Sequence, residues 1–465
     1  MLFSSLIFLY AFLPCTLLAY FLTPRRGKNP VLLLASLLFY AWGEPRYLIL
    51  ILLNILLGFT AGLGIHRFRG RLLGRLFLLT SVAGSLGLLC CFKYGDFFLS
   101  AINGALGISL PLWRLALPVG ISFYTFQILS YTIDLYRGDV EVQRNPVSFA
   151  LYVALFPQLI AGPIVKYETV ADQIDNRQES WDDFAAGCAR FIAGLGKKVL
   201  IANQVAVVAD RAFNLGNGEL SASFAWLGAI CYTLQIYYDF SGYSDMAIGL
   251  GKMFGFHFLE NFNYPYISKS ITEFWRRWHI SLSACFRDYV YFPLGGSRVS
   301  SKWKHIRNLF VVWLLTGVWH GANWTFIVWG LLYFVLLVLE KYGHLGRGWP
   351  VWLNWLFTLL MVNFAWVIFR ADSLGAAGQY LLAMFGGGAG AWSELTALYL
   401  RENWTVLLAG LVFAAPVAPR LRDWLVRRDW PMVDLLYALG AAAVFLVSAA
   451  FIIKGTYNPF IYFNF

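Results

Sequence analysis

Long uncharged apolar segments recur along almost the whole of this 465-residue chain, and they limit what it can fold into. Residues 2–23 carry no charged side chain and are long enough to cross the hydrocarbon layer of a bilayer. Hydrophobic residues make up 59% of the chain and charged residues only 13%, about half the charged fraction of a typical soluble domain. The sequence therefore predicts a polytopic membrane protein of the all-α class.

The other apolar segments predict about 11 transmembrane helices, although several of them are too short to span a bilayer. Pro14, Pro118, Pro157 and Pro163 interrupt such segments, which favours kinked, re-entrant or interfacial helices around a buried cavity. We expect one membrane domain over 1–465, with N-terminal helices at 1–235, a catalytic core at 236–340 and C-terminal helices at 341–465. The further apolar segments are 31–42, 47–64, 76–92, 115–133, 148–162, 191–209, 223–236, 309–318, 322–339, 352–369, 405–418 and 433–453.

Basic residues outnumber acidic ones by 36 to 25, which gives the chain a net charge of +11. The positive-inside bias of membrane proteins accounts for this excess, so no nucleic-acid partner is expected. Two basic groups, within 25–28 and 67–75, are separated by two apolar segments, so both can face the cytoplasm, with the N-terminus outside. Segment 273–307 is also basic and should be cytoplasmic. It is either a landing surface for an anionic donor or a contact with anionic lipid headgroups.

His320 lies inside the apolar stretch 310–334, FVVWLLTGVWHGANWTFIVWGLLYF, where it is the only ionisable side chain apart from one tyrosine. An ionisable group at that depth is either functional or costly. The alternative is a core histidine hydrogen-bonded to a neighbouring carbonyl. The six cysteines show neither metal-ligand spacing nor a secreted disulfide pattern, so neither a metal centre nor a bound cofactor is expected.

Three polar and aromatic blocks at 236–256, 261–298 and 317–330 break the hydrophobic pattern, and they contain DFSGYSD, WRRWHISLS and GVWHGANW. Their arrangement resembles the membrane-bound O-acyltransferase family. Segments 118–138 and 156–167 and the terminal TYNPFIYFNF look like the bacterial branch that acetylates alginate and related exopolysaccharides. The resemblance covers essentially the whole chain, and it implies a helical fold with a central tunnel.

On that resemblance, His320 corresponds to the histidine that the family treats as its central catalytic residue. His279 occupies a second polar position, where many eukaryotic members carry asparagine. An exposed or capping histidine would be unremarkable in the basic segment around His279, so a structural role stays open there. Trp319 and Trp324 are expected to line the tunnel, with core or interfacial packing as the alternative.

Asp239 and Asp245 flank DFSGYSD in an apolar region, where two carboxylates are expensive unless they face water or basic partners. Arg276 and Arg277 are the candidate partners. The residues around Asp239 either shape a substrate tunnel or act as buried polar groups that fix the helix bundle, and we slightly favour the second role. The candidate substrate-binding residues are Trp319, Trp324, Asp239, Ser241, Tyr243, Arg276 and Arg277.

Transfer of an acyl group from a thioester to a hydroxyl needs a base for the hydroxyl proton and donors for the carbonyl oxygen. A buried, neutral imidazole suits the first task, because burial penalises its charged form. We expect His320 to act as the general base and His279 to assist as a hydrogen-bond donor or orienter. Acyl transfer through a covalent acyl-histidine is the alternative.

The expected donor is acetyl-coenzyme A on the cytoplasmic side of a bacterial inner membrane. The expected acceptor is a hydroxyl of an extracytoplasmic partner acetylase or of a polysaccharide. Within the same family, a D-alanyl transferase of teichoic acids is the competing prediction. From other classes, a secondary transporter or a non-catalytic scaffold of a polysaccharide secretion complex would also account for the intramembrane histidine and the broken helices.

Overall fold

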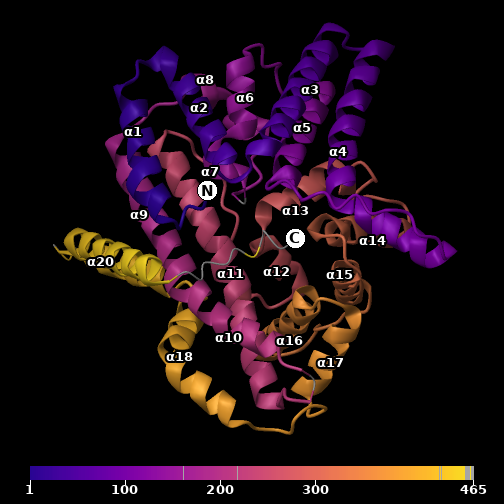
Figure 1. The fold of residues 1–465 in the computed structure, drawn as a ribbon, viewed down its shortest axis with the longest axis vertical. Coiled ribbons are helices and arrows are strands. Elements are labelled where there is room, and N and C mark those ends of the chain that lie inside the picture. Colours follow the sequence, from indigo (N-terminus) through magenta and orange to yellow (C-terminus); the bar gives the residue numbers. More distant parts are fainter. Residues whose placement is uncertain (161, 217, 429, 431, 456–460, 462–465) are drawn as a thin grey trace. The chain divides into compact units, whose positions relative to one another are not determined.

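The computed structural model describes residues 1–160, 162–216, 218–428, 430, 432–455 and 461, and these residues form helices and connecting loops without a strand (Figure 1). The all-α class is therefore confirmed. By length and composition, six of the described helical segments can cross a membrane, or seven if the bent pair α18 (Glu394–Phe413) and α19 (Val417–Val426) forms one span. The chain is a multi-pass membrane protein.

The predicted count of about 11 crossings is not confirmed, because several apolar segments break into short helices. Segment 148–162 forms α6 (Pro146–Ala154) and α7 (Phe156–Leu159), which are separated at Leu155, two residues before Pro157. Such breaks agree with the predicted effect of the prolines, since proline cannot continue a helix without losing a hydrogen bond. The six candidate spans are Pro45–Arg67, Leu72–Leu106, Trp181–Phe213, Trp324–Tyr342, Val351–Arg370 and Val433–Lys454.

The described residues form two compact units. The first contains residues 1–191 and 244–259, and the second contains residues 192–243 and 260–465. The first unit is built from η1 (Phe8–Phe12), α1 (Leu13–Leu22), α2 (Arg25–Gly43), η2 (Pro45–Tyr47), α3 (Leu48–Arg67), α4 (Leu72–Leu106), α5 (Ile121–Arg137), α6, α7, α8 (Tyr167–Asn176) and most of α9 (Trp181–Gly196).

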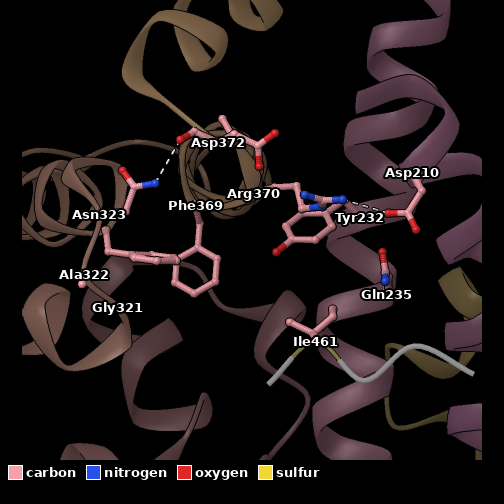
Figure 2. A pocket seen from close by; sticks show the side chains of 12 residues that line it. Asp210, Tyr232, Gln235, Gly321, Ala322, Asn323, Phe369, Arg370, Asp372 and Ile461 are labelled. Carbon is pink, nitrogen blue, oxygen red and sulfur yellow. Dashed lines mark hydrogen bonds and ion pairs between the residues drawn. The ribbon is translucent and has the colours of Figure 1, made fainter. Parts of the chain in front are cut away.

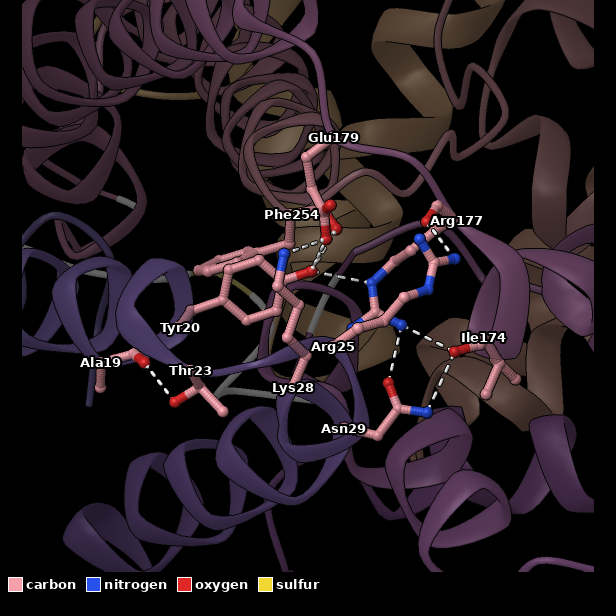
Figure 3. A network of polar contacts seen from close by, with 10 residues as sticks. All are labelled: Ala19, Tyr20, Thr23, Arg25, Lys28, Asn29, Ile174, Arg177, Glu179 and Phe254. Atoms are coloured by element: carbon pink, nitrogen blue, oxygen red, sulfur yellow. Dashed lines mark hydrogen bonds and ion pairs between the residues drawn. The ribbon is translucent and has the colours of Figure 1, made fainter.

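A polar network ties the ends of several elements together in the first unit (Figure 3). Glu179 accepts hydrogen bonds from the Tyr20 hydroxyl and from Lys28 Nζ, the latter at 3.0 Å. Arg177 donates to the Tyr20 hydroxyl at 3.0 Å and to Asn29 Oδ1 at 2.7 Å. Burial alone would raise the pKa of the Glu179 carboxyl, but the bonds from Tyr20 and Lys28 lower it below its usual range. The network therefore holds a charged glutamate that links α1 and α2 to the loop before α9.

The second unit contains the residues predicted to be catalytic. Its elements are η3 (Lys197–Ala202), α10 (Asn203–Phe213), α11 (Ala222–Met253, whose last turns belong to the first unit), η4 (Pro265–Ile267), α12 (Ile271–Arg277), α13 (Ile280–Phe286), η5 (Arg287–Tyr291), α14 (Lys302–His320), α15 (Trp324–Tyr342), α16 (Val351–Arg370), α17 (Leu374–Met384), α18, α19 and α20 (Val433–Lys454).

Helices α14 and α15 form a closely packed hairpin. A Cβ on Gly317 would lie 2.5 Å from the backbone oxygen of Phe326, and a Cβ on Gly330 would collide with the backbone oxygen of Trp313. Glycine is needed at both positions because the two backbones approach so closely, as is common where membrane helices cross. The hairpin holds the C-terminal end of α14 in place, and the last residue of α14 is His320.

Hydrogen bonds at both ends set the directions of α14, α15 and α16. At one end, His305 Nδ1 lies 2.8 Å from the Tyr342 hydroxyl, which joins the start of α14 to the end of α15. At the other end, Asn323 Nδ2 donates to the backbone oxygen of Asp372 at 3.0 Å, which joins the start of α15 to the residues after α16. The end of α14, the start of α15 and the end of α16 therefore meet, and the functional site lies where they meet.

Candidate active site

His320 is the last residue of α14, and its imidazole is enclosed by aromatic rings. Its ring centroid lies 4.9 Å from those of Trp319 and Trp329 and 5.1 Å from that of Phe369, each at a steep angle. The helix stops here because Gly321 is extended and Asn323 caps the next helix, its side chain accepting a bond from Thr325 N at 3.1 Å. The sequence thus places a 6% exposed imidazole at a helix end.

His279 lies between α12 and α13, outside the six candidate spans, and it is 1% exposed. Its φ of +45° is in the left-handed region, which side-chain-bearing residues rarely adopt. The Phe240 ring packs edge-on against its imidazole at a centroid distance of 4.6 Å. The structure therefore places His279 in the protein interior and not on the surface of a basic segment.

Hydrogen bonds define which nitrogen of His279 carries a proton. The backbone N–H and the hydroxyl of Ser281 both donate to Asn261 Oδ1, at 3.2 and 2.9 Å, so this atom is an acceptor. His279 Nδ1 lies 3.2 Å from the same oxygen and must donate to it. Its Nε2 is buried and has no hydrogen-bond partner among the described residues.

Burial lowers the pKa of His279 to about 3, so the imidazole is neutral at working pH. A neutral imidazole that donates through Nδ1 has its lone pair on Nε2. Within the described part of the chain, nothing occupies that lone pair. His279 can therefore accept a hydrogen bond or a proton from a bound molecule.

Trp319 is the shared neighbour of the two histidines. Its ring centroid is 5.9 Å from that of His279 and 4.9 Å from that of His320. The structure thus brings together three residues that the sequence motifs singled out, although 40 residues separate the two histidines in the chain. Trp324 is different, because it begins α15 with 56% of its surface exposed and does not line the neighbouring cavity.

A polar cavity of about 400 Å³ lies next to the end of α14, and neither His320 nor His279 is among the residues that line it (Figure 2). Gly321 and Phe369 both line it, and Phe369 is the ring that packs against the His320 imidazole. Arg370 and Asp210 form an ion pair of 3.0 Å in its wall. The remaining lining residues are Tyr232, Gln235, Ala322, Asn323, Phe326, Ala371, Asp372 and Ile461.

Asp239, Ser241 and Tyr243 are each about 2% exposed on α11. Asp239 forms an ion pair of 2.5 Å with Lys198 and accepts a bond of 2.8 Å from the backbone N–H of Ile461. The Ser241 hydroxyl has no partner among the described residues. None of these three residues lines the cavity, so the structure gives them the surroundings of buried polar groups within a helix bundle.

The predicted pairing of the two aspartates with Arg276 and Arg277 is wrong. Asp245 pairs with Arg190 at 2.8 Å, and Asp239 pairs with Lys198. Arg277 pairs with Glu273 on its own helix at 2.9 Å, and Arg276 is exposed. The reason is that α12 buries its aromatic residues, Phe274 and Trp275, and this leaves the two arginines on its outer side.

Comparison with known proteins bears directly on this site. The sequence profile of the membrane-bound O-acyltransferase family matches residues 140–373, which include both histidines and almost the whole cavity lining. A probable alginate O-acetylase of Pseudomonas putida is 43% identical over 492 residues, which cover 100% of both chains. The chain belongs to the membrane-bound O-acyltransferase family. This confirms the resemblance seen in the sequence motifs, and the protein is an O-acyltransferase.

Two further relatives differ in how much of the chain they match. The peptidoglycan O-acetyltransferase of Helicobacter pylori is 35% identical over 516 residues, which cover 100% of this chain and 98% of that protein. The teichoic acid D-alanyltransferase of Bacillus subtilis is 28% identical over 276 residues, which cover 54% of this chain and 68% of that protein.

Several residues around the O-acyltransferase site were not predicted from the sequence. Three of them are polar residues that lie within or directly after predicted apolar segments, namely Lys198, Gln235 and Arg370. That position in the sequence was the feature that could have identified them. Polar residues that interrupt such segments tend to face the protein interior. Of the terminal segment TYNPFIYFNF, whose motif supported the bacterial branch, only Ile461 belongs to the described residues.

Proposed function

We propose that this O-acyltransferase is a membrane O-acetyltransferase of the bacterial inner membrane. It moves acetyl groups from a cytoplasmic thioester donor, acetyl-coenzyme A, across the membrane for the O-acetylation of an exopolysaccharide such as alginate or cellulose. Full-length similarity to a protein named as an alginate O-acetylase supports the acetyl group and the type of polymer. The final acceptor hydroxyl belongs to the polysaccharide or to an extracytoplasmic partner acetylase.

The observation that carries this proposal is that two buried imidazoles both pack against the indole of Trp319, next to a polar cavity. In the proposed reaction His320 removes the proton of the acceptor hydroxyl, and the oxygen of that hydroxyl attacks the thioester carbonyl. The carbon–sulfur bond then breaks, and the proton passes from His320 to the leaving thiolate. General-base catalysis of this kind contributes about 10²–10⁴-fold to the rate.

His279 has a second role in this proposal. Its Nδ1–H is committed to Asn261, so Nε2 can accept a hydrogen bond but not donate one. This geometry favours His279 as a group that orients a hydroxyl over the role of hydrogen-bond donor. Asn261 then acts as a positioning residue, because it selects the tautomer of His279.

The two ends of α14 support separate approaches for donor and acceptor. Lys302, Lys304 and Arg307 lie in its first two turns, and His320 is its last residue. Its partner in the hairpin, α15, is one of the six candidate spans and has 19 residues, so it is about 28 Å long, which is close to the thickness of the hydrocarbon layer. The basic end suits the phosphates of acetyl-coenzyme A, and the cavity beside His320 suits an acceptor from the other side.

The competing proposal is D-alanyl transfer to teichoic acid. The similarity to the Bacillus subtilis enzyme supports it, but that match covers little more than half of this chain, whereas the two O-acetylating relatives match its full length. The two proposals require different acyl groups, acetyl and D-alanyl, and this difference decides the experiment.

The test is to incubate the purified full-length protein in lipid bilayers with labelled acetyl-coenzyme A, or with a labelled D-alanyl carrier protein, and to follow loss of the thioester. We expect turnover of acetyl-coenzyme A only, and a loss of at least about 10²-fold in the His320→Ala protein. The variant must show the same expression and melting temperature as the wild type. Normal acetyl transfer by such a folded variant would refute His320 as the base, and turnover of the D-alanyl carrier alone would refute the acetyl donor.

A further inference from the structure

Helix α19 differs from its neighbours because none of its ten residues is buried. It follows α18 after a bend of 65°. The next helix, α20, is one of the six candidate spans and begins a few residues after α19 ends, at Val433. The start of a membrane span lies at the bilayer surface, so α19 is held close to that surface.

One face of α19 is apolar. Val417, Leu421 and Trp424 follow the i, i+4, i+7 spacing that places side chains in one stripe along a helix. They are 41%, 54% and 49% exposed, so the chain leaves about half of each side chain uncovered. Tryptophan is enriched where headgroups meet acyl chains, and Trp424 fits that position. The stripe therefore suits shallow insertion into the boundary between headgroups and acyl chains.

The rest of α19 and the residues after it are basic. Between 417 and 430 the chain has four arginines and two aspartates, which gives this segment a net charge of +2. The arginines are Arg420, Arg422, Arg427 and Arg428. So many charges would be costly within the hydrocarbon layer, and this excludes α19 as the continuation of a span that begins in α18.

The arginines lie on both sides of the apolar stripe. Arg420 and Arg427 are seven residues apart, so they share one flank, and Arg422 lies on the other. The Arg422 guanidinium is 5.5 Å from the ring centroid of Tyr437 on α20, which ties α19 to the start of that span. An apolar stripe between two basic flanks is typical of a helix that lies flat on an anionic membrane.

We propose that α19 lies in the headgroup layer and binds anionic phospholipids. Val417, Leu421 and Trp424 contact the acyl chains, and Arg420 and Arg427 bond to the lipid phosphates, since guanidinium groups suit phosphate oxygens. A lipid surface meets the apolar stripe and both basic flanks at once. This inference goes beyond the proposed acyl transfer and does not depend on it.

The test compares two lipids at one labelled position. The full-length protein without its six native cysteines carries Leu421→Cys with a fluorophore and is reconstituted in phosphatidylcholine vesicles. A small fraction of spin-labelled phosphatidylglycerol or phosphatidylcholine, with the same quencher on the acyl chain, is then added. We expect phosphatidylglycerol to be enriched about fivefold at the label, because each basic residue at an anionic surface contributes about this much.

Two controls make this enrichment specific to charge. High salt should reduce it, because exposed charges are screened. A label at Leu56→Cys, which is 57% exposed within the candidate span Pro45–Arg67, should be quenched equally by both lipids.

Variants of the arginines identify the residues responsible. The double variant Arg420→Gln, Arg427→Gln should lower the enrichment at least about threefold. The matched control is Arg347→Gln, Arg401→Gln, which removes two exposed arginines outside α19 and should retain the enrichment.

Equal quenching by both spin-labelled lipids at Leu421→Cys would overturn the inference, as would an enrichment that the Arg420→Gln, Arg427→Gln protein retains in full. Absence of quenching by either lipid would also overturn it, and would show that α19 stands clear of the bilayer and offers its exposed face to a protein. None of these outcomes involves the thioester, so each leaves the proposed function to be decided by its own assay.

Discussion

At the scale of single residues, His279 combines a strained backbone with a precisely held side chain. A left-handed φ costs a residue other than glycine about 1–3 kcal/mol, and this conformation persists only where neighbouring groups enforce it. Here the bond to Asn261 and the ring of Phe240 enforce it. Strain of this kind is concentrated at functional sites, which agrees with the proposed orienting role of His279.

The buried neutral state of His279 predicts an acid-sensitive stability. Its pKa is about 3 in the folded protein and near the usual 6.5 when unfolded, so between these values the unfolded chain binds the extra proton. Stability should therefore be complete above about pH 6.5 and fall as the pH drops, by at most about 1.4 kcal/mol per pH unit. Thermal unfolding in detergent at pH 7.0 and 5.0 measures this, and His279→Gln should lose less stability on acidification than the wild type.

His66→Gln is the control for this prediction, because His66 is exposed at the end of α3. It should retain the acid sensitivity of the wild type. If the wild type and His279→Gln lose the same stability between the two pH values, His279 is not the group that titrates.

The buried ion pair of Lys198 and Asp239 gives a second prediction at this scale. The two side chains are 3% and 2% exposed, so removing one leaves a buried charge uncompensated. Lys198→Met should destabilise the protein by about 3–5 kcal/mol, and adding Asp239→Asn should restore part of that loss. Chemical denaturation of the single and double variants measures the coupling between the two residues.

The more exposed pair of Arg277 and Glu273 is the control, since breaking it should cost about 1 kcal/mol or less. Equal effects at both pairs would contradict the importance of burial. So would a double variant that is less stable than Lys198→Met alone.

The sequence identified the chemistry of the site better than its contacts. His320 and His279 stood out by their motifs, and the structure places both in the interior beside Trp319. Their roles in catalysis stay predictions. The partner of Asp239 was missed because Lys198 lies 41 residues upstream in an apolar segment, and such pairing depends on how distant helices pack. Gln235 was missed because one polar residue in an apolar segment does not show which side it faces.

At the scale of helices, the crossing of α14 and α15 positions both His320 and the start of the cavity. Gly317→Ala would place a methyl group 2.5 Å from the backbone oxygen of Phe326, which cannot move without displacing α15. We expect a loss of several kcal/mol in stability, comparable with overpacking in a core, and a matching loss of acyl transfer. Melting temperature and thioester turnover are the measurements.

Gly440→Ala on α20 is the matched control, because a Cβ there meets no atom within 4 Å. It should leave stability unchanged or slightly raised, since alanine is the better helix former. A Gly317→Ala protein as stable as Gly440→Ala would show that the crossing tolerates a wider separation.

The helical class could be predicted from composition, but the number of spans could not. Hydropathy shows that a segment is apolar without showing where its helix breaks. Segment 115–133 illustrates this, because the chain has no helix from 107 to 120 and α5 begins only at Ile121. The division of the chain at residues 235 and 340 also stays a prediction.

At the scale of the whole molecule, the basic end of α14 and the cavity end should face opposite sides of the membrane. From the positive-inside bias, we expect the basic end in the cytoplasm. In a variant without the six native cysteines, Ser300→Cys should react with an impermeant maleimide only after the membrane is opened. Gly375 is exposed and follows Asp372, which lines the cavity, by three residues. The Gly375→Cys variant should therefore react from the outside in intact cells.

Both positions lie in the second unit, so their labelling can be compared directly. Reaction of both cysteines from one side would contradict the separate approaches of donor and acceptor. Reaction of Gly375→Cys from the cytoplasm alone would reverse the proposed orientation.

The glycine crossing between α14 and α15 also limits how this enzyme can be redesigned. Because the backbones of α14 and α15 are in direct contact, His320 and Asn323 form one rigid wall of the site, and neither residue can move without the other. The opposite wall of the cavity contains Tyr232 and Gln235 from α11 and Arg370 from α16. Attempts to broaden the range of acceptors should therefore vary the residues of α11 and α16 and keep those of α14 and α15 unchanged.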